Sequence, residues 1–179
     1  MNCSIRIATT DDVDAIAEIG RTTFARAYGE IVLPGDMTSY VAKHFSPELI
    51  RSEIVSKAAT YFIAEADQAV AGYAKIAETA NPEQLAHEKT IELQRLYVAA
   101  GHCGKGIGDK LFTAVTQSAV ASAYTALWLQ VWEKNAGAIA FYEKAGLQRF
   151  GIEPYLIGTT ANPVVLMYKI LSPGHESAT

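Results

Sequence analysis

The sequence contains few cysteines. Only Cys3 and Cys103 occur among 179 residues, with no Cys-x-x-Cys pair and no nearby pair of histidines at zinc-site spacing. We therefore expect neither a disulfide scaffold nor a structural metal site. So little cysteine is typical of a protein from a reducing cytoplasm, which is the location we expect.

Long apolar runs and basic runs are also lacking. No apolar stretch approaches the roughly 20 residues needed to span a bilayer. The first twenty residues carry four acids, which is wrong for a signal peptide. Lys and Arg number 15 against 19 Asp and Glu, for a net charge of −4, and no basic cluster occurs. We therefore expect neither a membrane nor a nucleic acid as a partner.

Hydrophobic residues make up 50% of the chain, which is enough to build a core without disulfides or a bound metal. The patterns predict the order β-α-α-β-β-β-α-β-α-β-β, with a first helix running to about Tyr28. Pro34 and Gly35 then interrupt the chain, a short helical piece is expected near Met37 to Phe45, and Ser46-Pro47-Glu48 starts another helix. This order indicates one mixed α/β domain over residues 1–172, and we expect a disordered tail at 173–179. Consecutive strands before Gly101 argue against a regular Rossmann sheet.

A glycine-rich segment, Gly104-Lys105-Gly106-Ile107-Gly108, lies between a predicted strand and a predicted helix. Glycines let backbone N–H groups approach an anion closely, and a helix N-terminus adds about half a positive charge. The alternative is a flexible strand-to-helix loop. No Walker spacing and no Gly-x-Gly-x-x-Gly are present, which disfavours a P-loop or a dinucleotide site.

Two further patterns are candidates for chemistry. Asn135 and Tyr142 are seven residues apart, so on a helix they lie close to one face. The ordinary interpretation of these two residues is a helix cap and a core aromatic. Glu92 lies in a largely apolar strand, beside Gln94 if the strand is regular, and such a carboxylate has a raised pKa that suits a general base. A solvated edge position, or an ion pair with Arg95 or a lysine, is the alternative.

Taken together, four segments resemble the GNAT superfamily of acetyl-CoA-dependent N-acetyltransferases in order and spacing. They are Leu96-Tyr97-Val98, Gly104 to Gly108, Trp132-Glu133-Lys134-Asn135, and the run from Ala138 to Leu147. The likeness is strong over residues 91–151. Residues 91–98 and 127–150, with Leu166-Met167-Tyr168-Lys169, look most like bacterial spermidine/spermine N-acetyltransferases of the PaiA type. The resemblance implies an α/β (α+β) fold, in which helices flank a mixed central sheet with a splayed strand pair.

The resemblance also implies roles for particular residues in an acyltransferase that uses acetyl-CoA as co-substrate. Pantetheine would lie along the strand ending in Leu96, Tyr97 and Val98. The pyrophosphate would meet the backbone of Gly104, Lys105, Gly106, Ile107, Gly108 and Asp109. Asn135 would contact the cofactor near pantetheine, and Lys144 would approach its phosphates. Tyr142 would protonate the departing thiolate, and Glu92 would be the general base.

One position departs from the family pattern. The family usually has Gln or Arg where this chain has Cys103, so one phosphate contact is lost while the backbone cradle remains.

The resemblance implies a small-molecule primary amine as acceptor, attacking acetyl-CoA directly in a ternary complex. A polyamine such as spermidine or spermine is one such acceptor, because acids and aromatics between the first helix and the second strand suit a polycation. They are Phe24, Tyr28, Glu30, Asp36, Tyr40 and Phe45. Surface acids and core aromatics are the ordinary interpretation of these residues, and we favour it for most of the positions. A protein, peptide or antibiotic amine, or a non-catalytic acyl-CoA-binding module, remains open. A homodimer paired through sheet edges or C-terminal strands is compatible with the family.

Overall fold

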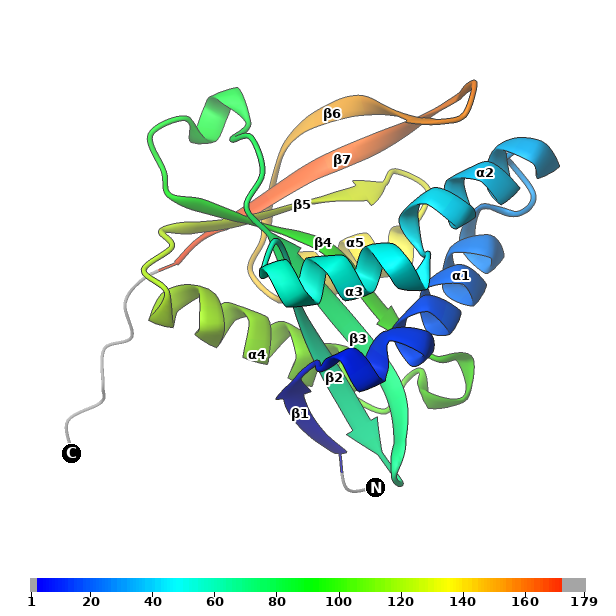
Figure 1. Ribbon diagram of the computed structural model, residues 1–179. Coiled ribbons are helices and arrows are strands. Elements are labelled where there is room, and N and C mark those ends of the chain that lie inside the picture. Colours follow the sequence, from blue (N-terminus) through cyan, green and yellow to red (C-terminus); the bar gives the residue numbers. More distant parts are fainter. Residues whose placement is uncertain (1–2, 172–179) are drawn as a thin grey trace.

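The computed structural model describes residues 3–171, which form one seven-stranded mixed sheet with helices on both faces (Figure 1). The segment predicted as a tail, 173–179, lies outside the described residues. The strands are β1 Cys3–Ile7, β2 Thr60–Ala66, β3 Ala69–Ala77, β4 Thr90–Val98, β5 Ala126–Trp132, β6 Gln148–Ile157 and β7 Thr160–Ile170. The α-helices are α1 Val13–Tyr28, α2 Pro34–His44, α3 Pro47–Ser56, α4 Ile107–Ala121 and α5 Ala136–Lys144.

The strand order in the sheet is β1-β2-β3-β4-β5-β7-β6. Every neighbouring pair is antiparallel except β4 and β5, which run parallel with α4 as their crossover. A parallel pair requires such a crossover connection, whereas the tight turn at Asp67 and Gln68 suffices for antiparallel β2 and β3. The predicted mixed sheet in a single α+β domain is confirmed.

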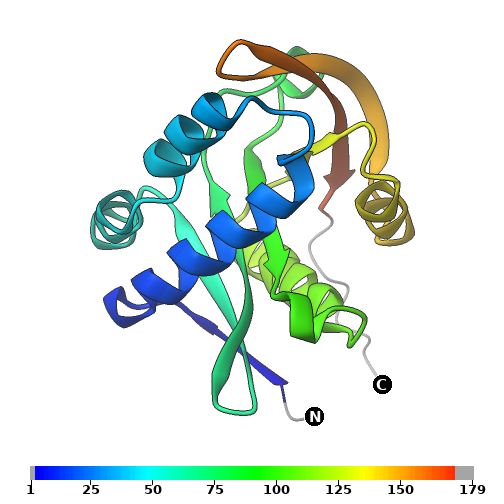
Figure 2. The ribbon, with the colours of Figure 1, turned by 90° about the vertical axis from the view of Figure 1, so that its right-hand side faces the viewer.

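Helices cover both faces of this sheet (Figure 2). One core cluster packs α4 and α5 against β2 to β5 and includes Leu111, Leu127 and Tyr142. A second cluster packs α1 and α3 against the other face and includes Ile16 and Tyr73. Because successive residues of a strand point to opposite faces, each residue of β4 belongs to one side or the other.

Local signals start and end the helices. Ser46 caps α3 by accepting from the Leu49 amide at 3.2 Å, with Pro47 at the first helical position. Gly146, with φ of +89°, follows the end of α5. Three helices separate β1 from β2, and α2 begins at Pro34 rather than near Met37, because proline is favoured at the first helical position. Among residues 3–171, no helix combines the length and the apolar character that a membrane span requires.

Candidate active site

Strands β4 and β5 separate partway along their length. They pair only at Thr90 with Ala126, Ile91 with Leu127 and Glu92 with Trp128. Beyond this point β4 continues to Val98 and β5 to Trp132 without pairing to each other, and Figure 1 shows them diverging. The predicted splay is therefore confirmed, and the edge of β4 that faces β5 has no strand partner over residues 93–98.

A β-bulge lies in β4 at the start of this opening. Leu93 pairs with Ile76 and Arg95 with Lys75, so Gln94 has no counterpart in β3. Leu93 and Leu96 therefore both face α4 and α5. The bulge turns Arg95 and Tyr97 toward α1. The strand is therefore irregular, and the condition under which alternation was used to place Glu92 beside Gln94 is not met.

Glu92 lies on the α1 face of β4, half-buried beside Gln94. The Gln94 Nε2 atom donates to Glu92 Oε2 at 3.3 Å, so these two side chains do meet despite the bulge. Burial raises the pKa of the Glu92 carboxyl, against the opposing effects of the Gln94 hydrogen bond and the Lys75 charge. Within residues 3–171 no basic side chain is in ion-pair distance of Glu92, so the alternative of a paired carboxylate does not apply.

Tyr142 lies on the opposite face of the sheet, in the last turn of α5. It is 8% exposed and packs against Phe112 and Phe141, with ring centroids 6.2 and 5.2 Å away. Burial raises the pKa of the Tyr142 phenol well above its ordinary value, so it stays protonated at neutral pH. A protonated phenol is a proton donor.

The glycine-rich segment leads into the N-terminus of α4. Gly104 and Gly106 have φ values of +74° and +75°, and a Cβ built on either would meet no atom within 4 Å. Open space therefore lies in front of this turn, where the first amides of α4 have no intrahelical acceptor. Ile107 is buried and Gly108 half-buried, whereas Asp109 is exposed. The arrangement suits an anion held by backbone N–H groups.

The remaining predicted cofactor residues lie at the two ends of α5 and in the glycine-rich turn itself. Asn135 caps α5, where its Oδ1 accepts from the Ala138 amide at 3.1 Å, as the ordinary interpretation predicts. Lys144 is exposed in the last turn of the same helix. Lys105 donates to the Gly101 carbonyl at 2.9 Å. The exposed Cys103 thiol lies 3.7 Å from the Val98 carbonyl oxygen. The cofactor contacts of Asn135 and Lys144 stay predictions.

Most of the residues expected to line the acceptor site form an aromatic cluster beside the splayed strands. Phe24 stacks on Tyr28 and on Tyr40, each with ring centroids 4.5 Å apart. Tyr28 contacts Trp132 at the end of β5, with a centroid distance of 5.3 Å. The Tyr40 and Tyr155 hydroxyls share a 2.6 Å hydrogen bond. Aromatic packing between α1, α2 and the open end of β5 therefore builds one wall of the opening.

The two acids of that segment are not part of this wall. Asp36 accepts two hydrogen bonds from Thr159, each at 3.1 Å, and so holds the turn between β6 and β7. Glu30 is exposed beyond the end of α1. The charged residue beside the aromatic cluster is Arg95, which the sequence reasoning considered only as an ion partner for Glu92. The sequence signal for this position is an arginine among the apolar residues of a predicted strand.

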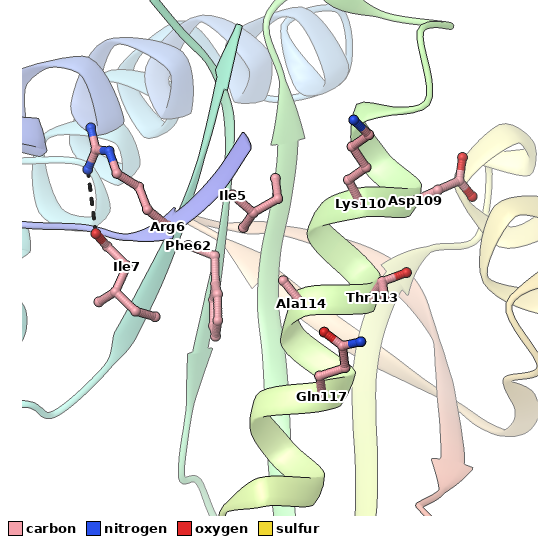
Figure 3. Close-up of a pocket in the computed structure, with 9 residues that line it drawn as sticks. All are labelled: Ile5, Arg6, Ile7, Phe62, Asp109, Lys110, Thr113, Ala114 and Gln117. Atoms are coloured by element: carbon pink, nitrogen blue, oxygen red, sulfur yellow. Dashed lines mark hydrogen bonds between the residues drawn. The ribbon is translucent and has the colours of Figure 1, made fainter. Parts of the chain in front are cut away.

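A separate groove of about 500 Å³ lies between β1 and α4 (Figure 3). Its lining includes Ile5, Phe62 and Gln117, and Asp109 and Lys110 lie at the N-terminal end of α4. Lys110 donates to the Cys3 carbonyl at 3.0 Å, so its ammonium is bound to β1 rather than free for the glycine turn. The groove is built from different residues than the splayed strands.

A splayed parallel strand pair, followed by a glycine turn into a helix, is the arrangement that the resemblance to acetyl-CoA-dependent N-acetyltransferases implies. The sequence matches the acetyltransferase (GNAT) family over residues 28–147, which is more than half of the chain. The chain belongs to this family and is an acetyl-CoA-dependent N-acetyltransferase.

Known relatives extend over nearly the whole chain. The uncharacterized N-acetyltransferase in the pepI 3′ region of Lactobacillus delbrueckii subsp. lactis is 28% identical over 160 residues, 89% of this chain and 92% of the relative. The PaiA N-acetyltransferase of Thermoplasma acidophilum, solved with coenzyme A, superposes with a TM-score of 0.74 at 21% identity, covering 95% of this chain and 99% of that one. The putative acetyltransferase YncA of Salmonella typhimurium, solved with acetyl-CoA, gives 0.75 at 18% identity, covering 100% and 99%. At these identities the two structures show a shared fold.

The residues of this chain fit acetyl-CoA. The edge of β4 facing β5 is unpaired over residues 93–98, which suits the amide-bearing pantetheine arm. Gly104 and Gly106 leave open space before the free amides of α4, which suits the pyrophosphate.

Proposed function

We propose that the protein transfers the acetyl group of acetyl-CoA to the primary amine of a small molecule, by direct attack in a ternary complex. The observation that carries this proposal is the end of β4–β5 pairing at Glu92 and Trp128. There the sheet opens between the face that carries Glu92 and the face that carries Tyr142. A base and an acid on opposite faces of a sheet act on one reacting centre only through such an opening.

Glu92 is the proposed general base. An amine is protonated near neutral pH and must lose a proton before it attacks. Burial supports this role, because it raises the pKa of the Glu92 carboxyl toward that of the ammonium group from which it would take the proton. Gln94, which donates to Glu92, would orient the carboxylate.

Tyr142 is the proposed proton donor to the departing thiolate. Its high pKa keeps the proton on the phenol until the thiolate forms. Its contacts with Phe112 and Phe141 fix the ring. Backbone N–H groups near Leu96, Tyr97 and Val98 would polarise the acetyl carbonyl, as oxyanion-hole donors do.

The proposed cofactor contacts are those that the resemblance to the GNAT superfamily implies. The backbone from Gly104 to Asp109 would hold the pyrophosphate, Asn135 would lie near pantetheine, and Lys144 would approach the phosphates. A polyamine acceptor stays a prediction. It receives little support from charge, because Asp36 binds Thr159 and Glu30 is exposed beyond the end of α1.

A panel assay tests the proposed function. The purified protein is mixed with acetyl-CoA and one amine at a time, thiol release is followed, and the product is identified by mass. We expect an N-acetylated product and no acetylated protein when the amine is omitted. Binding of acetyl-CoA without turnover on any amine would contradict catalysis and favour a non-catalytic acyl-CoA-binding module. Acetylation of Cys103 would contradict direct attack.

A further inference from the structure

Arg95 is a half-buried cation at the mouth of the splayed strands. Its guanidinium lies over the Phe45 ring, 4.4 Å from the centroid. Within residues 3–171 no carboxylate is in ion-pair distance of it. The Phe45 ring in turn packs against Tyr40 and Tyr97, with its centroid 6.4 Å from that of each ring. Arg95 is therefore surrounded by aromatic side chains rather than by anions.

The neighbouring carboxylate is already bound to other groups. Glu53 accepts from Lys75 Nζ at 2.7 Å through Oε1 and from the Tyr61 hydroxyl through Oε2. Lys75, the cross-strand partner of Arg95, is 4% exposed. Burial and then the charge of Arg95 lower the pKa of both Lys75 and His44. Two cations, Arg95 and Lys75, are therefore cross-strand neighbours, and among the described residues only Lys75 has a carboxylate in ion-pair distance.

An unpaired guanidinium in this position is costly without a ligand. Removing a charge from water carries a penalty that a single ring contact offsets only in part. Arginine presents a planar fork of N–H donors that matches a carboxylate or phosphonate with two parallel hydrogen bonds. An anion at this place would supply the missing partner.

The register sets the separation between Arg95 and the proposed base. Glu92 pairs with Ala77 and Arg95 with Lys75, so the two residues are two positions apart along β3, about 7 Å, and on the same face. A small molecule with an amine and an acid group a few bonds apart spans this interval. A polycation would place one of its ammonium groups against Arg95.

We infer that Arg95 binds an anionic group of the acceptor, and that the acceptor is a small amine that also carries a carboxylate or a similar acid, as amino acids do. This inference rests on the proposed function, because it identifies the substrate class of the same site. It gives Arg95 a role in specificity and leaves the transfer chemistry to other residues.

Calorimetry on the CoA complex tests the inference directly. The probes are free L-amino acids, each compared with its amide and its decarboxylated amine, together with spermidine. We expect at least one amino acid to bind, with an affinity at least 10-fold above that of its amide and amine. Equal affinities, tighter binding of spermidine, or no binding of any amino acid would overturn the inference.

Variants assign the effect to Arg95. Arg95→Gln should lower the affinity for the amino acid about 100-fold, as loss of one partner of a desolvated charge pair does. Its affinity for the neutral amide should stay unchanged. Arg95→Lys should retain part of the preference, and Arg51→Gln, which removes an exposed arginine from α3, should retain all of it. A preference for the amino acid that survives in folded Arg95→Gln protein would exclude this residue as the anion site.

Turnover with the same probes separates this inference from the proposed function. An amino acid that binds through Arg95 but is never acetylated contradicts the proposed function and leaves the anion site standing. Acetylation of neutral amines and amino acids with equal kcat/KM contradicts the anion site and leaves the proposed function standing.

Discussion

Glu92 and Trp128 are the last residues to pair across the parallel strands β4 and β5. They lie on one face of the sheet, opposite the core that holds Leu127, Leu129 and Tyr142. The opening therefore begins at the residue proposed as base. Past it, the bulge at Gln94 turns Arg95 and Tyr97 toward the α1 face. One irregularity in β4 thus determines which side chains border the site.

Glu92→Gln tests the general base. Glutamine keeps the size of the side chain and one oxygen that can accept from Gln94, but it takes up no proton, so the rate at pH 7 should fall about 100-fold or more. In the wild-type protein, kcat/KM should fall as the pH drops through the Glu92 pKa. Burial raises that pKa, so this limb should lie above the ordinary glutamate value of about 4.3. Initial rates across pH measure both effects.

The control for this variant is Glu83→Gln, which changes an exposed glutamate outside the site. It should behave as the wild type. A normal rate at pH 7 in Glu92→Gln would reject Glu92 as the base.

Tyr142→Phe tests the proton donor. The ring and its contacts with Phe112 and Phe141 remain while the hydroxyl is lost, so kcat should fall about 10- to 100-fold with little change in the KM for acetyl-CoA. Steady-state kinetics with acetyl-CoA as the varied substrate measure this split. Tyr168→Phe, on β7, is the matched control and should keep normal turnover. Unchanged kcat in Tyr142→Phe would remove the phenol from the mechanism.

Gly106→Ala tests the phosphate cradle. The position has φ of +75°, where an L side chain costs roughly 1–2 kcal/mol, and the new Cβ would project into the open space before α4. We expect a modest loss of stability and a loss of CoA affinity that calorimetry detects. Gly101→Ala adds a methyl group that also meets no atom within 4 Å, without the positive φ. Equal CoA affinity in the two variants would argue against a cradle at Gly106.

Asp12→Asn tests the anchor of the N-terminal strand. Asp12 accepts from both terminal nitrogens of Arg6 at 2.8 Å and from the Thr9 amide at 2.8 Å. The Arg6 hydrogen bonds hold the pKa of Asp12 below its ordinary value. The Arg6 side chain is 41% exposed, so solvent screens the pair, and we expect a loss of about 1–2 kcal/mol at pH 7.

The pH dependence of this stability has a defined sign. A carboxyl group with a lowered folded pKa stabilises the fold fully above its unfolded pKa, about 3.9, and loses that contribution as the pH falls through the folded value. Denaturant unfolding from pH 7 to pH 2 should therefore lose less stability in Asp12→Asn than in the wild type. Asp14→Asn, on exposed α1 surface, should follow the wild-type curve. Identical curves for Asp12→Asn and the wild type would contradict the anchor.

Much of the fold could be predicted because its signals are local. The caps at Ser46 and Asn135 and the turn at Asp67 and Gln68 are encoded within a few residues. The start of α2 at Pro34 was missed, because proline both ends helices and begins them.

The site was harder to predict because it depends on contacts distant in sequence. The bulge at Gln94 exists only relative to β3, so the face on which Arg95 lies was not readable from alternation. The hydrogen bond from the Thr159 amide to Asp36 joins residues that are 123 positions apart. The first fact places an arginine beside the aromatic cluster, and the second engages one of the acids expected to bind a polycation.

We propose that acetyl-CoA binds in the gap between β4 and β5. Amide hydrogen exchange, resolved by residue and measured with and without CoA, tests this binding site. We predict that CoA slows exchange in residues 93–98 and in the turn from Gly104 to Asp109, while β1 and β6 stay unchanged. If saturating CoA leaves both segments unprotected, the cofactor does not bind in the gap and the account is wrong.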